Sequence, residues 1–418
     1  MGSGHSSGSH AGSPVPDRAR WWLTAAIVPF VIATLVGLVA LWPGEIDDGL
    51  AEVVGAPDEL VGGRILTVAV DPCPGTTEGE AVRCASARIR ILEGPDADEV
   101  VTLVLQTVGA DRQAGPGDAV VLSFVDDAEA AFRYSFADFD RRRPLLLLGI
   151  GFVAAVIVLG RWQGVRALLG TGVSLGVLVV FVLPAVLEGS PPLAVALTAS
   201  SLIALVALYL VHGVNARSTT AVLGTLVSLA LVGVLGALVV DAGNFTGLAS
   251  EEAGFVRAFS GEVDLRGLLL GGVVIGALGV LDDVTVTQVS AVWELRTANP
   301  GYRRTELYRS ALRIGRDHIA STVNTLVLAY AGASLPLLLL FTQLDQSLDR
   351  VVNGEVVAAE VVRTLVGSIG LVASVPVTTA LAVAVATAAP TGTSPREDRR
   401  RVLGRREERF RRELRATG

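Results

Sequence analysis

Long apolar segments recur along this chain, and they restrict its fold more than any other feature. A helix needs about 20 predominantly apolar residues to cross the hydrocarbon core of a bilayer. Eight segments approach or exceed that length: Trp21–Trp42, Pro144–Gly160, Leu168–Leu187, Leu193–Val211, Thr219–Val240, Gly267–Trp293, Thr322–Phe341 and Thr364–Ala388. Because only 18% of the residues are charged, the sequence predicts a polytopic α-helical membrane protein with about eight transmembrane helices.

The segments between and around these stretches predict five regions. We expect a disordered cytoplasmic tail over residues 1–20, a transmembrane anchor over 21–42, an extracytoplasmic β domain over 45–140, a seven-helix membrane domain over 144–388 and a basic cytoplasmic tail over 389–418. A cleaved signal peptide is the competing interpretation of the anchor. Its apolar region would be about 7–15 residues long, whereas Trp21–Trp42 is longer and has no clear small-residue cleavage site.

The region between the first two apolar segments predicts a small β-rich domain. Runs rich in Val, Ile, Leu and Thr are separated by turn signals such as Glu93-Gly94-Pro95-Asp96, which is the pattern of short strands. The expected strands are Arg64–Val70, Ala87–Leu92, Val100–Thr107 and Ala119–Phe124. They are expected to form a half-buried sheet or a small barrel of about five strands.

The only two cysteines, Cys73 and Cys84, flank a short Pro/Gly-containing loop of this domain. In an oxidising compartment a structural disulfide between them is expected. Free thiols or a metal or redox pair are the alternatives, although the sequence offers no further ligands at metal-site spacing. We therefore expect no metal site.

Charge predicts the orientation in the plasma membrane. With the N-terminus inside, the inner segments collect arginine and the outer loops collect Asp and Glu, as the positive-inside rule requires. The exception is Arg141–Arg143. Both termini are then cytoplasmic and the β domain lies outside. The basic stretch Arg396–Arg415 is expected to bind anionic lipid and not nucleic acid.

One apolar segment carries two adjacent carboxylates, Asp282 and Asp283. The run before them, Leu268–Leu281, has 14 residues, which is roughly 21 Å of helix and too short for a core of about 30 Å. A spanning helix must therefore continue past the aspartates, which places them inside the membrane. Intramembrane carboxylates usually mark an ion pathway, a proton relay or a substrate site. The alternative is that the pair ends the span at the cytoplasmic membrane edge.

Helical spacing predicts what accompanies this pair. Steps of three and four place Asp283, Thr287, Ser290 and Glu294 on one stripe, with Asp282, Thr285 and Gln288 beside it. We expect the stripe to face a bundle interior or a water-filled cavity. Adjacent carboxylates in a low dielectric do not readily both ionise, so at least one is expected to hold a proton. Upstream, small residues predict close helix packing at Gly272, Gly276 and Gly279.

A polar stretch opens the seventh apolar segment. Asn324 and its Ser and Thr neighbours are expected either to hydrogen-bond the acidic helix or to make simple interhelical bonds. His318 is either a group that titrates near neutral pH or an interfacial residue beside Asp317. The preceding Arg296–Ala320 alternates arginines with apolar residues and predicts an amphipathic helix on the inner leaflet.

Two stretches carry a resemblance to a known family. Gly276–Gln288 (GALGVLDDVTVTQ) and Gly315–Pro336 (GRDHIASTVNTLVLAYAGASLP) closely resemble the YibE/F-like bacterial membrane proteins, from about Pro144 to the last span. The anchor and β domain resemble the longer actinobacterial members. The resemblance implies fold class and location. It also implies a homo- or hetero-oligomer with a paralogue, because the family name covers paired proteins.

A weaker resemblance concerns mechanism. The Gly-rich helix with its Asp-Asp pair is similar to the proton-relay region of resistance-nodulation-division exporters and SecD/SecF-type subunits, which implies proton coupling at Asp282 or Asp283. The chain departs from that pattern in having eight expected spans rather than six, a small outer domain and no lysine.

The sequence shows no P-loop, HExxH, GxSxG or Rossmann fingerprint. We therefore expect no cofactor and no enzymatic activity. The leading hypothesis is an ion-gradient-coupled transporter or exporter with Asp282 and Asp283 at its coupling site. A non-transporting scaffold or sensor, whose β domain binds an envelope ligand, is the rival. An intramembrane aspartyl enzyme would need carboxylates from two helices.

Overall fold

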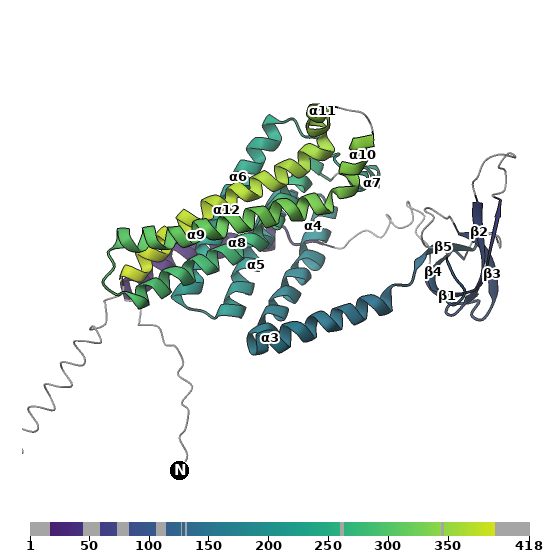
Figure 1. The fold of residues 1–418 in the computed structure, drawn as a ribbon, viewed down its shortest axis with the longest axis horizontal. Coiled ribbons are helices and arrows are strands. Elements are labelled where there is room, and N and C mark those ends of the chain that lie inside the picture. The colour runs from purple at the N-terminus through teal and green to yellow at the C-terminus, as the bar shows by residue number, and fades with distance from the viewer. Residues whose placement is uncertain are drawn as a thin grey trace, which may run out of the picture. The chain divides into compact units, whose positions relative to one another are not determined.

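Two compact units make up the chain, Asp47–Arg161 and a second formed by Met1–Ile46 together with Trp162–Gly418. The computed structural model describes residues 17–44, 59–72, 83–105, 114–126, 128–129, 132–259, 263–343 and 347–388. Its elements are labelled in Figure 1. Each unit has its own hydrophobic core. Cys73 and both expected tails, apart from residues 17–20, lie outside the described residues, so the disulfide and the lipid-binding tail stay predictions.

The first unit contains a five-stranded antiparallel sheet in the order β3-β2-β1-β4-β5. Its strands are β1 (Glu59–Pro72), β2 (Arg83–Ile91), β3 (Val100–Leu105), β4 (Ala119–Phe124) and β5 (Tyr134–Phe139). Alternate residues such as Ile65, Ile89 and Leu122 point into one core and are fully buried. The edge strands β3 and β5 also contact each other, so the sheet curls into a half-barrel.

The strand β1 is long enough to pair with two neighbours, β2 along its second half and β4 along its first. A register shift between Ile65 and Thr67 interrupts the pairing with β2 just beyond the end of the pairing with β4, and such a bulge bends the strand. All four expected strands are present. The fifth, β5, was not among the named strands because its aromatic and polar residues form only a short alternating run.

The second unit is a bundle of helices around α8. Its described elements are α1 (Asp17–Ala40), the end of α3 (Arg142–Val177), the π-helical turn η1 (Leu178–Val182), α4 (Leu183–Leu187), α5 (Pro192–His212), α6 (Ala216–Ala242), α7 (Glu251–Phe259), α8 (Leu265–Ala298), α9 (Arg304–Ala333), α10 (Leu335–Gln343), α11 (Leu348–Asn353) and α12 (Glu355–Ala388). The helix α8 packs against α5, α6, α9 and α12, several of which run side by side in Figure 1.

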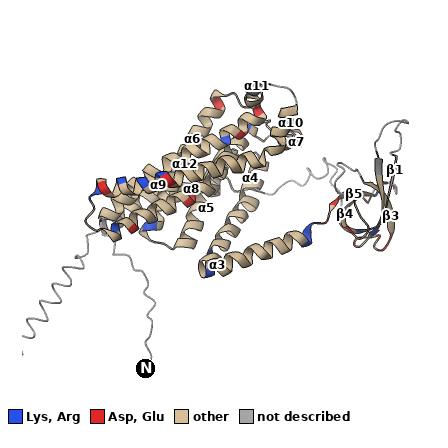
Figure 2. Cartoon of the chain, viewed as in Figure 1, with Lys and Arg blue, Asp and Glu red and all other residues tan. Residues whose placement is uncertain are grey.

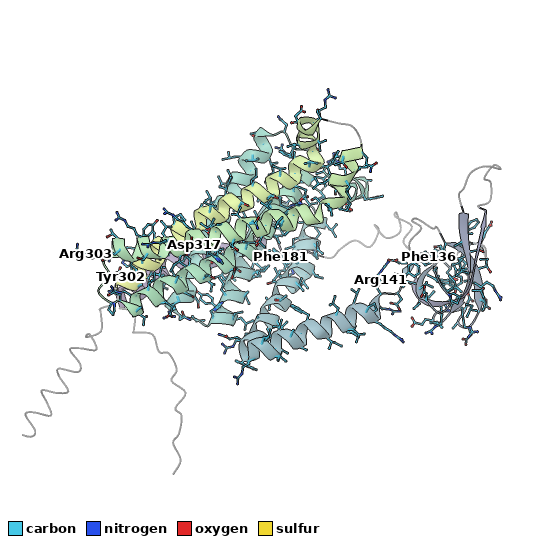
Figure 3. All side chains as sticks on the ribbon, viewed as in Figure 1. Phe136, Arg141, Phe181, Tyr302, Arg303 and Asp317 are labelled. Atoms are coloured by element: carbon cyan, nitrogen blue, oxygen red, sulfur yellow. The ribbon has the colours of Figure 1, made fainter. Side chains whose placement is uncertain are left out.

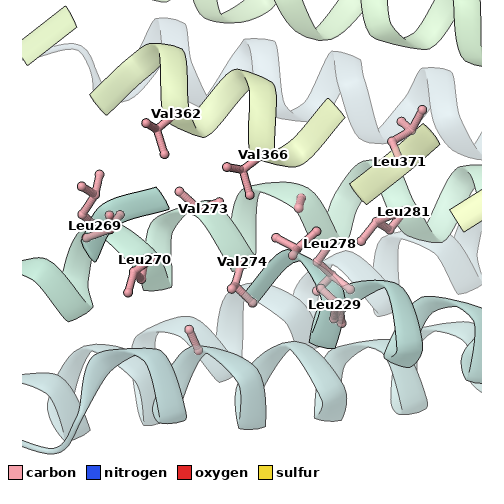
Figure 4. Close-up of a cluster of buried hydrophobic side chains, with 14 of the residues drawn as sticks. Leu229, Leu269, Leu270, Val273, Val274, Leu278, Leu281, Val362, Val366 and Leu371 are labelled. Atoms are coloured by element: carbon pink, nitrogen blue, oxygen red, sulfur yellow. The ribbon is translucent and has the colours of Figure 1, made fainter. Parts of the chain in front are cut away.

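The largest core of this bundle lies between α6, α8 and α12 (Figure 4). Leu229 of α6, Leu278 and Leu281 of α8, and Val366 and Leu371 of α12 are all buried there. In a membrane, lipid tails are as apolar as these side chains. The contacts therefore stabilise the bundle by close packing more than by removal from water.

Among the described residues, six helices are long and apolar enough to span a membrane, or seven when the bent pair α9 and α10 counts as one span. Two expected spans, Pro144–Gly160 and Leu168–Leu187, fall in one tract of 46 residues, Arg142–Leu187. That tract would measure about 69 Å if straight, more than twice a bilayer core. It is interrupted at Arg161, whose φ of 51° and ψ of −130° are not helical.

The seventh expected span also differs from its prediction. The helix α9 runs without interruption from Arg304 to Ala333, so it joins the expected surface helix to the first half of the expected span. Its residues Leu307, Ala311 and Gly315 are buried against neighbouring helices. The chain then bends by 61° into α10, where Pro336 fits the first turn of a new helix because its missing N–H is not needed there.

Charged positions are concentrated toward the ends of the bundle helices (Figure 2). Arginines gather where α9 begins, at Arg303, Arg304 and Arg309. Tyr302 and Arg303 mark that end in Figure 3, and Asp317 lies farther along the same helix. The apolar middle and charged ends are the pattern of a membrane protein.

Candidate functional site

The aspartate pair lies near the middle of α8, a helix of 34 residues. The Asp264 side chain caps its N-terminus by accepting a hydrogen bond from the Gly267 N–H. The helix then continues past Asp282 and Asp283 to Ala298, a length of about 51 Å. The helix therefore does not end at the aspartates, and its continuation is what the span-length argument predicted.

The Asp282 side chain is directed toward α6. Its Oδ1 atom is buried and has no hydrogen-bond partner among the described residues. The Thr225 hydroxyl of α6 lies within hydrogen-bonding reach of the same carboxyl group. The ion pairs found in the described part of the chain do not include Asp282. The carboxyl group thus sits between helices with a hydroxyl neighbour and no cation.

Two threonines join α6 to α8 beside this carboxyl group. Thr225 Oγ1 and Thr285 Oγ1 lie 2.8 Å apart, and Thr285 is fully buried. The Thr285 hydroxyl also donates to the Asp282 backbone carbonyl at 3.2 Å. The three side chains form one polar cluster in an otherwise apolar helix contact.

Asp283 occupies a different surface of the same helix. Its side chain is 70% exposed, and its Oδ2 atom lies 3.7 Å from His318 Nε2 of α9. That nitrogen is buried and has no hydrogen bond within the described residues. Consecutive helical residues point about 100° apart. The two carboxylates therefore do not share one environment, and the expected repulsion between them is weakened.

Gln288 fastens three helices together. Its side chain is buried, and its Nε2 donates to the Ala311 carbonyl of α9 at 2.9 Å and to Thr379 Oγ1 of α12 at 2.7 Å. Gly315 of α9 leaves room for this amide, because a Cβ there would lie 2.7 Å from Gln288 Oε1. Gln288 therefore helps to fix the position of α9, the helix that carries His318.

The other expected site residues lie apart from this cluster. Glu294 is 75% exposed and pairs with Arg217 of α6 at 3.9 Å. Thr287 and Asn324 are exposed. Together with Asp283 and Ser290, Thr287 and Glu294 form an exposed stripe. Of the two expected surroundings, the bundle interior therefore does not apply, and a water-filled cavity stays a prediction.

The predicted packing glycines also do not make close helix contacts. Gly272, Gly276 and Gly279 are exposed. A Cβ at Gly276 would meet only the Tyr330 hydroxyl at 3.0 Å, and one at Gly279 would meet nothing within 4 Å. Close contacts instead occur at glycines such as Gly271, where a Cβ would lie 3.2 Å from the Pro192 carbonyl oxygen.

Sequence reasoning missed the threonines of the neighbouring helices. Single threonines such as Thr225 and Thr379 are common packing residues of apolar helices, yet both are fully buried here and contact the polar side chains of α8. A detectable signal was the pair Thr225 and Ser228, which falls on one face of an apolar helix. No group of three or more metal-ligating side chains occurs within the residues that were placed.

Comparison with known proteins gives one match. The family model described as YibE/F-like protein matches residues 148–388, which include α8, α9 and α12. Searches of the curated proteins and of the solved structures found no match.

Proposed function

We propose that this chain, which belongs to the YibE/F-like family, is an ion-gradient-coupled transporter or exporter in which the Asp282 carboxyl group takes up and releases a proton. The observation that carries the proposal is the buried Asp282 Oδ1 atom, which has neither a hydrogen bond nor a cation among the described residues. A membrane location follows from the apolar helices and the family.

The chemistry of this carboxyl group favours a proton over a metal cation. An ionised carboxylate between apolar helices loses its hydration and must be paired, neutralised or hydrated again. Protonation neutralises it without further ligands. A bound metal cation would need several oxygen ligands, and here the nearby oxygens are those of Thr225 and Thr285. Proton binding is therefore the simpler function for the cluster.

His318 and Asp283 supply a second site for proton exchange. The imidazole is the side chain whose charge changes most readily near neutral pH. Its Nε2 atom lies 3.7 Å from Asp283 Oδ2, slightly more than a hydrogen-bond length, so a small movement of the exposed Asp283 side chain would allow direct proton exchange. Gln288 would be a positioning residue, since it bonds α9 at Ala311, about two turns before His318.

The orientation belongs to the same proposal. Eight spans, cytoplasmic termini and an extracytoplasmic β domain require that Arg142–Leu187 cross the plasma membrane twice, with the break at Arg161 as its inner turn. Arginines there and at the start of α9 would then both face the cytoplasm. The basic tail would bind anionic lipid, and assembly with a second copy or a paralogue would take place in the membrane.

The test is proton flux in proteoliposomes that contain the full chain and an entrapped pH dye. Flux in the wild type that falls at least tenfold in Asp282→Asn supports the proposal. Asp349→Asn is the matched control, because this exposed carboxylate lies on α11 outside the candidate site, and we expect it to keep the flux. An equal flux in all three proteins refutes a role for Asp282.

A carbodiimide reaction tests protonation without any cargo. Carbodiimides modify protonated carboxyl groups in apolar surroundings, so Asp282 should react at neutral pH and Glu294 should not. Unreactive Asp282 in folded protein, together with absent flux, favours the scaffold or sensor in which the β domain binds a ligand. An enzymatic role is not part of the proposal.

A further inference from the structure

The exposed positions of α8 between Gly272 and Glu294 form a face without any apolar side chain. They are Gly272, Gly276, Gly279, Asp283, Thr287, Ser290 and Glu294, called here the polar face. Every other residue in this stretch is buried or half-buried. The polar face extends for about 33 Å along the helix, which matches a hydrocarbon core of about 30 Å.

Neighbouring helices show what a lipid-facing surface of this protein looks like. The exposed positions of α12 include Leu365, Ile369 and Val372, and those of α6 include Leu231 and Leu238. All five are apolar, as contact with lipid tails requires. The polar face of α8 has no such apolar side chain. Contact between lipid tails and an ionisable side chain such as Asp283 is energetically unfavourable.

Polar side chains of α9 and α12 accompany the polar face along its length. The Tyr330 hydroxyl lies 3.0 Å from the Cβ position of Gly276, and Arg363 Nη2 lies 4.0 Å from that of Gly272. Arg363 is ion-paired with Glu360. His318 lies beside Asp283. Ionisable or hydrogen-bonding groups therefore recur from one end of the polar face to the other.

A second helix packed on the glycines is the competing explanation for this face. Glycine-mediated helix pairs need backbones in close approach. Here the polar ends of Tyr330 and Arg363 already lie over two of the three glycines. They keep another backbone away while offering hydrogen bonds, which is the arrangement expected beside water.

We infer that the polar face of α8 is one wall of a water-filled path across the membrane, and that Tyr330, Glu360 and Arg363 form a second polar site along it for a small hydrated ion. This inference deepens the proposed transport function. It rests on different residues, because the Asp282 carboxyl group is directed toward α6.

Cysteine accessibility in the full chain, reconstituted in vesicles, tests the path. Gly279→Cys, Thr287→Cys and Ser290→Cys are exposed to a membrane-impermeant, positively charged methanethiosulfonate. Leu365→Cys and Ile369→Cys are the matched controls, since both positions are exposed and apolar. Wild type gives the background of Cys73 and Cys84, and peptide mass spectrometry assigns each labelled site.

We expect labelling of the three polar-face cysteines at least tenfold faster than of the two controls. Equal rates in folded protein overturn the inference, because the face would then be covered by lipid or protein. An oxidant-induced dimer through Gly279→Cys overturns it too, in favour of a second copy. For the second site, we expect Tyr330→Phe and Glu360→Gln to change the labelling rate at Thr287→Cys by less than twofold but to lower ion flux.

Repeating the labelling in an Asp282→Asn background separates the two proposals. Fast labelling with no proton flux in either background supports the water-filled path and refutes the coupling role of Asp282. Slow labelling together with a proton flux that depends on Asp282 refutes the water-filled path along α8 and supports the coupling role of Asp282.

Discussion

Gly224 of α6 offers the sharpest test of how the helices around the candidate site are packed. A Cβ at this position would overlap the Thr378 hydroxyl of α12. It would also lie only 3.2 Å from Thr378 Cβ and from Thr378 Cγ2. Gly224→Ala therefore requires the Thr378 side chain to rotate or α6 and α12 to move apart. The same contact region carries Thr225, which reaches Asp282.

The magnitude follows from the geometry. Overpacking of a close contact costs about 1–3 kcal/mol, whereas alanine alone favours a helix over glycine by about 1 kcal/mol. We expect Gly224→Ala to destabilise the bundle by about 1–2 kcal/mol. Thr378 Oγ1 is buried and has no hydrogen bond within the described chain, so Thr378→Ala should be close to neutral, and it removes the overlapping atom.

The double variant should therefore be more stable than Gly224→Ala alone, by about 1 kcal/mol or more. Denaturant-induced unfolding of the full chain in mixed micelles measures all four proteins of this cycle. Gly279→Ala is the matched control, because a Cβ there meets nothing within 4 Å, and it should be neutral or stabilising. Equal stabilities of Gly224→Ala and Gly279→Ala, or the absence of rescue by Thr378→Ala, would refute the described packing of α6 on α12.

Three further predictions concern other contacts. Gln288→Leu should destabilise the bundle by about 1–2 kcal/mol, since it removes the bonds to Ala311 and Thr379, and unfolding in micelles measures the loss. Glu355→Ala should cost about 2 kcal/mol, because its carboxylate accepts from the N–H groups of Thr246 and Gly247 and from the Thr246 hydroxyl; Glu355→Gln should cost less in the same assay, and an equal cost would count against these bonds. Burial, followed by the hydrogen bond to Asp96, raises the pKa of Tyr134 to about 12, so its contribution to β-domain stability should be complete below pH about 10 and lost as the pH rises through about 12. Phenolate absorbance of the wild type minus that of Tyr134→Phe checks this, and a difference titration centred near 10 would contradict it.

The sequence predicted which segments form helices, because a long run of apolar residues is a strong indication of a membrane-spanning helix. The break at Arg161 falls between the expected spans Pro144–Gly160 and Leu168–Leu187, as the sequence indicated. The bend between α9 and α10 was not readable, because it falls inside the expected span Thr322–Phe341. The arginine-rich stretch from Arg304 to Ala320 continues into the next helix without interruption, since no proline occurs between Arg304 and Pro336.

The candidate site was only partly predictable for a related reason. Residues on α8 were found because Asp282, Thr285 and Gln288 are unusual in an apolar helix. Their partners Thr225 and Thr379 come from helices far away in the sequence, where single threonines are common. Spacing gave the stripe from Asp283 to Glu294 correctly, but it could not say which side of the helix the other helices cover.

Asp282 and Asp283 are adjacent in the sequence, but their side chains lie in different surroundings. A carboxyl pair that shares one proton needs both groups in one pocket, as the expectation of mutual repulsion assumed. On α8 the carboxyl group of Asp282 reaches Thr225 of α6, whereas Asp283 is 70% exposed and faces His318 of α9. A helix cannot turn consecutive side chains to the same side without losing its backbone bonds, and α8 is unbroken there. The two residues therefore contact different helix neighbours, so under the proposed function a proton bound at Asp282 would change the contact with α6 and leave the contact of Asp283 with α9 in place.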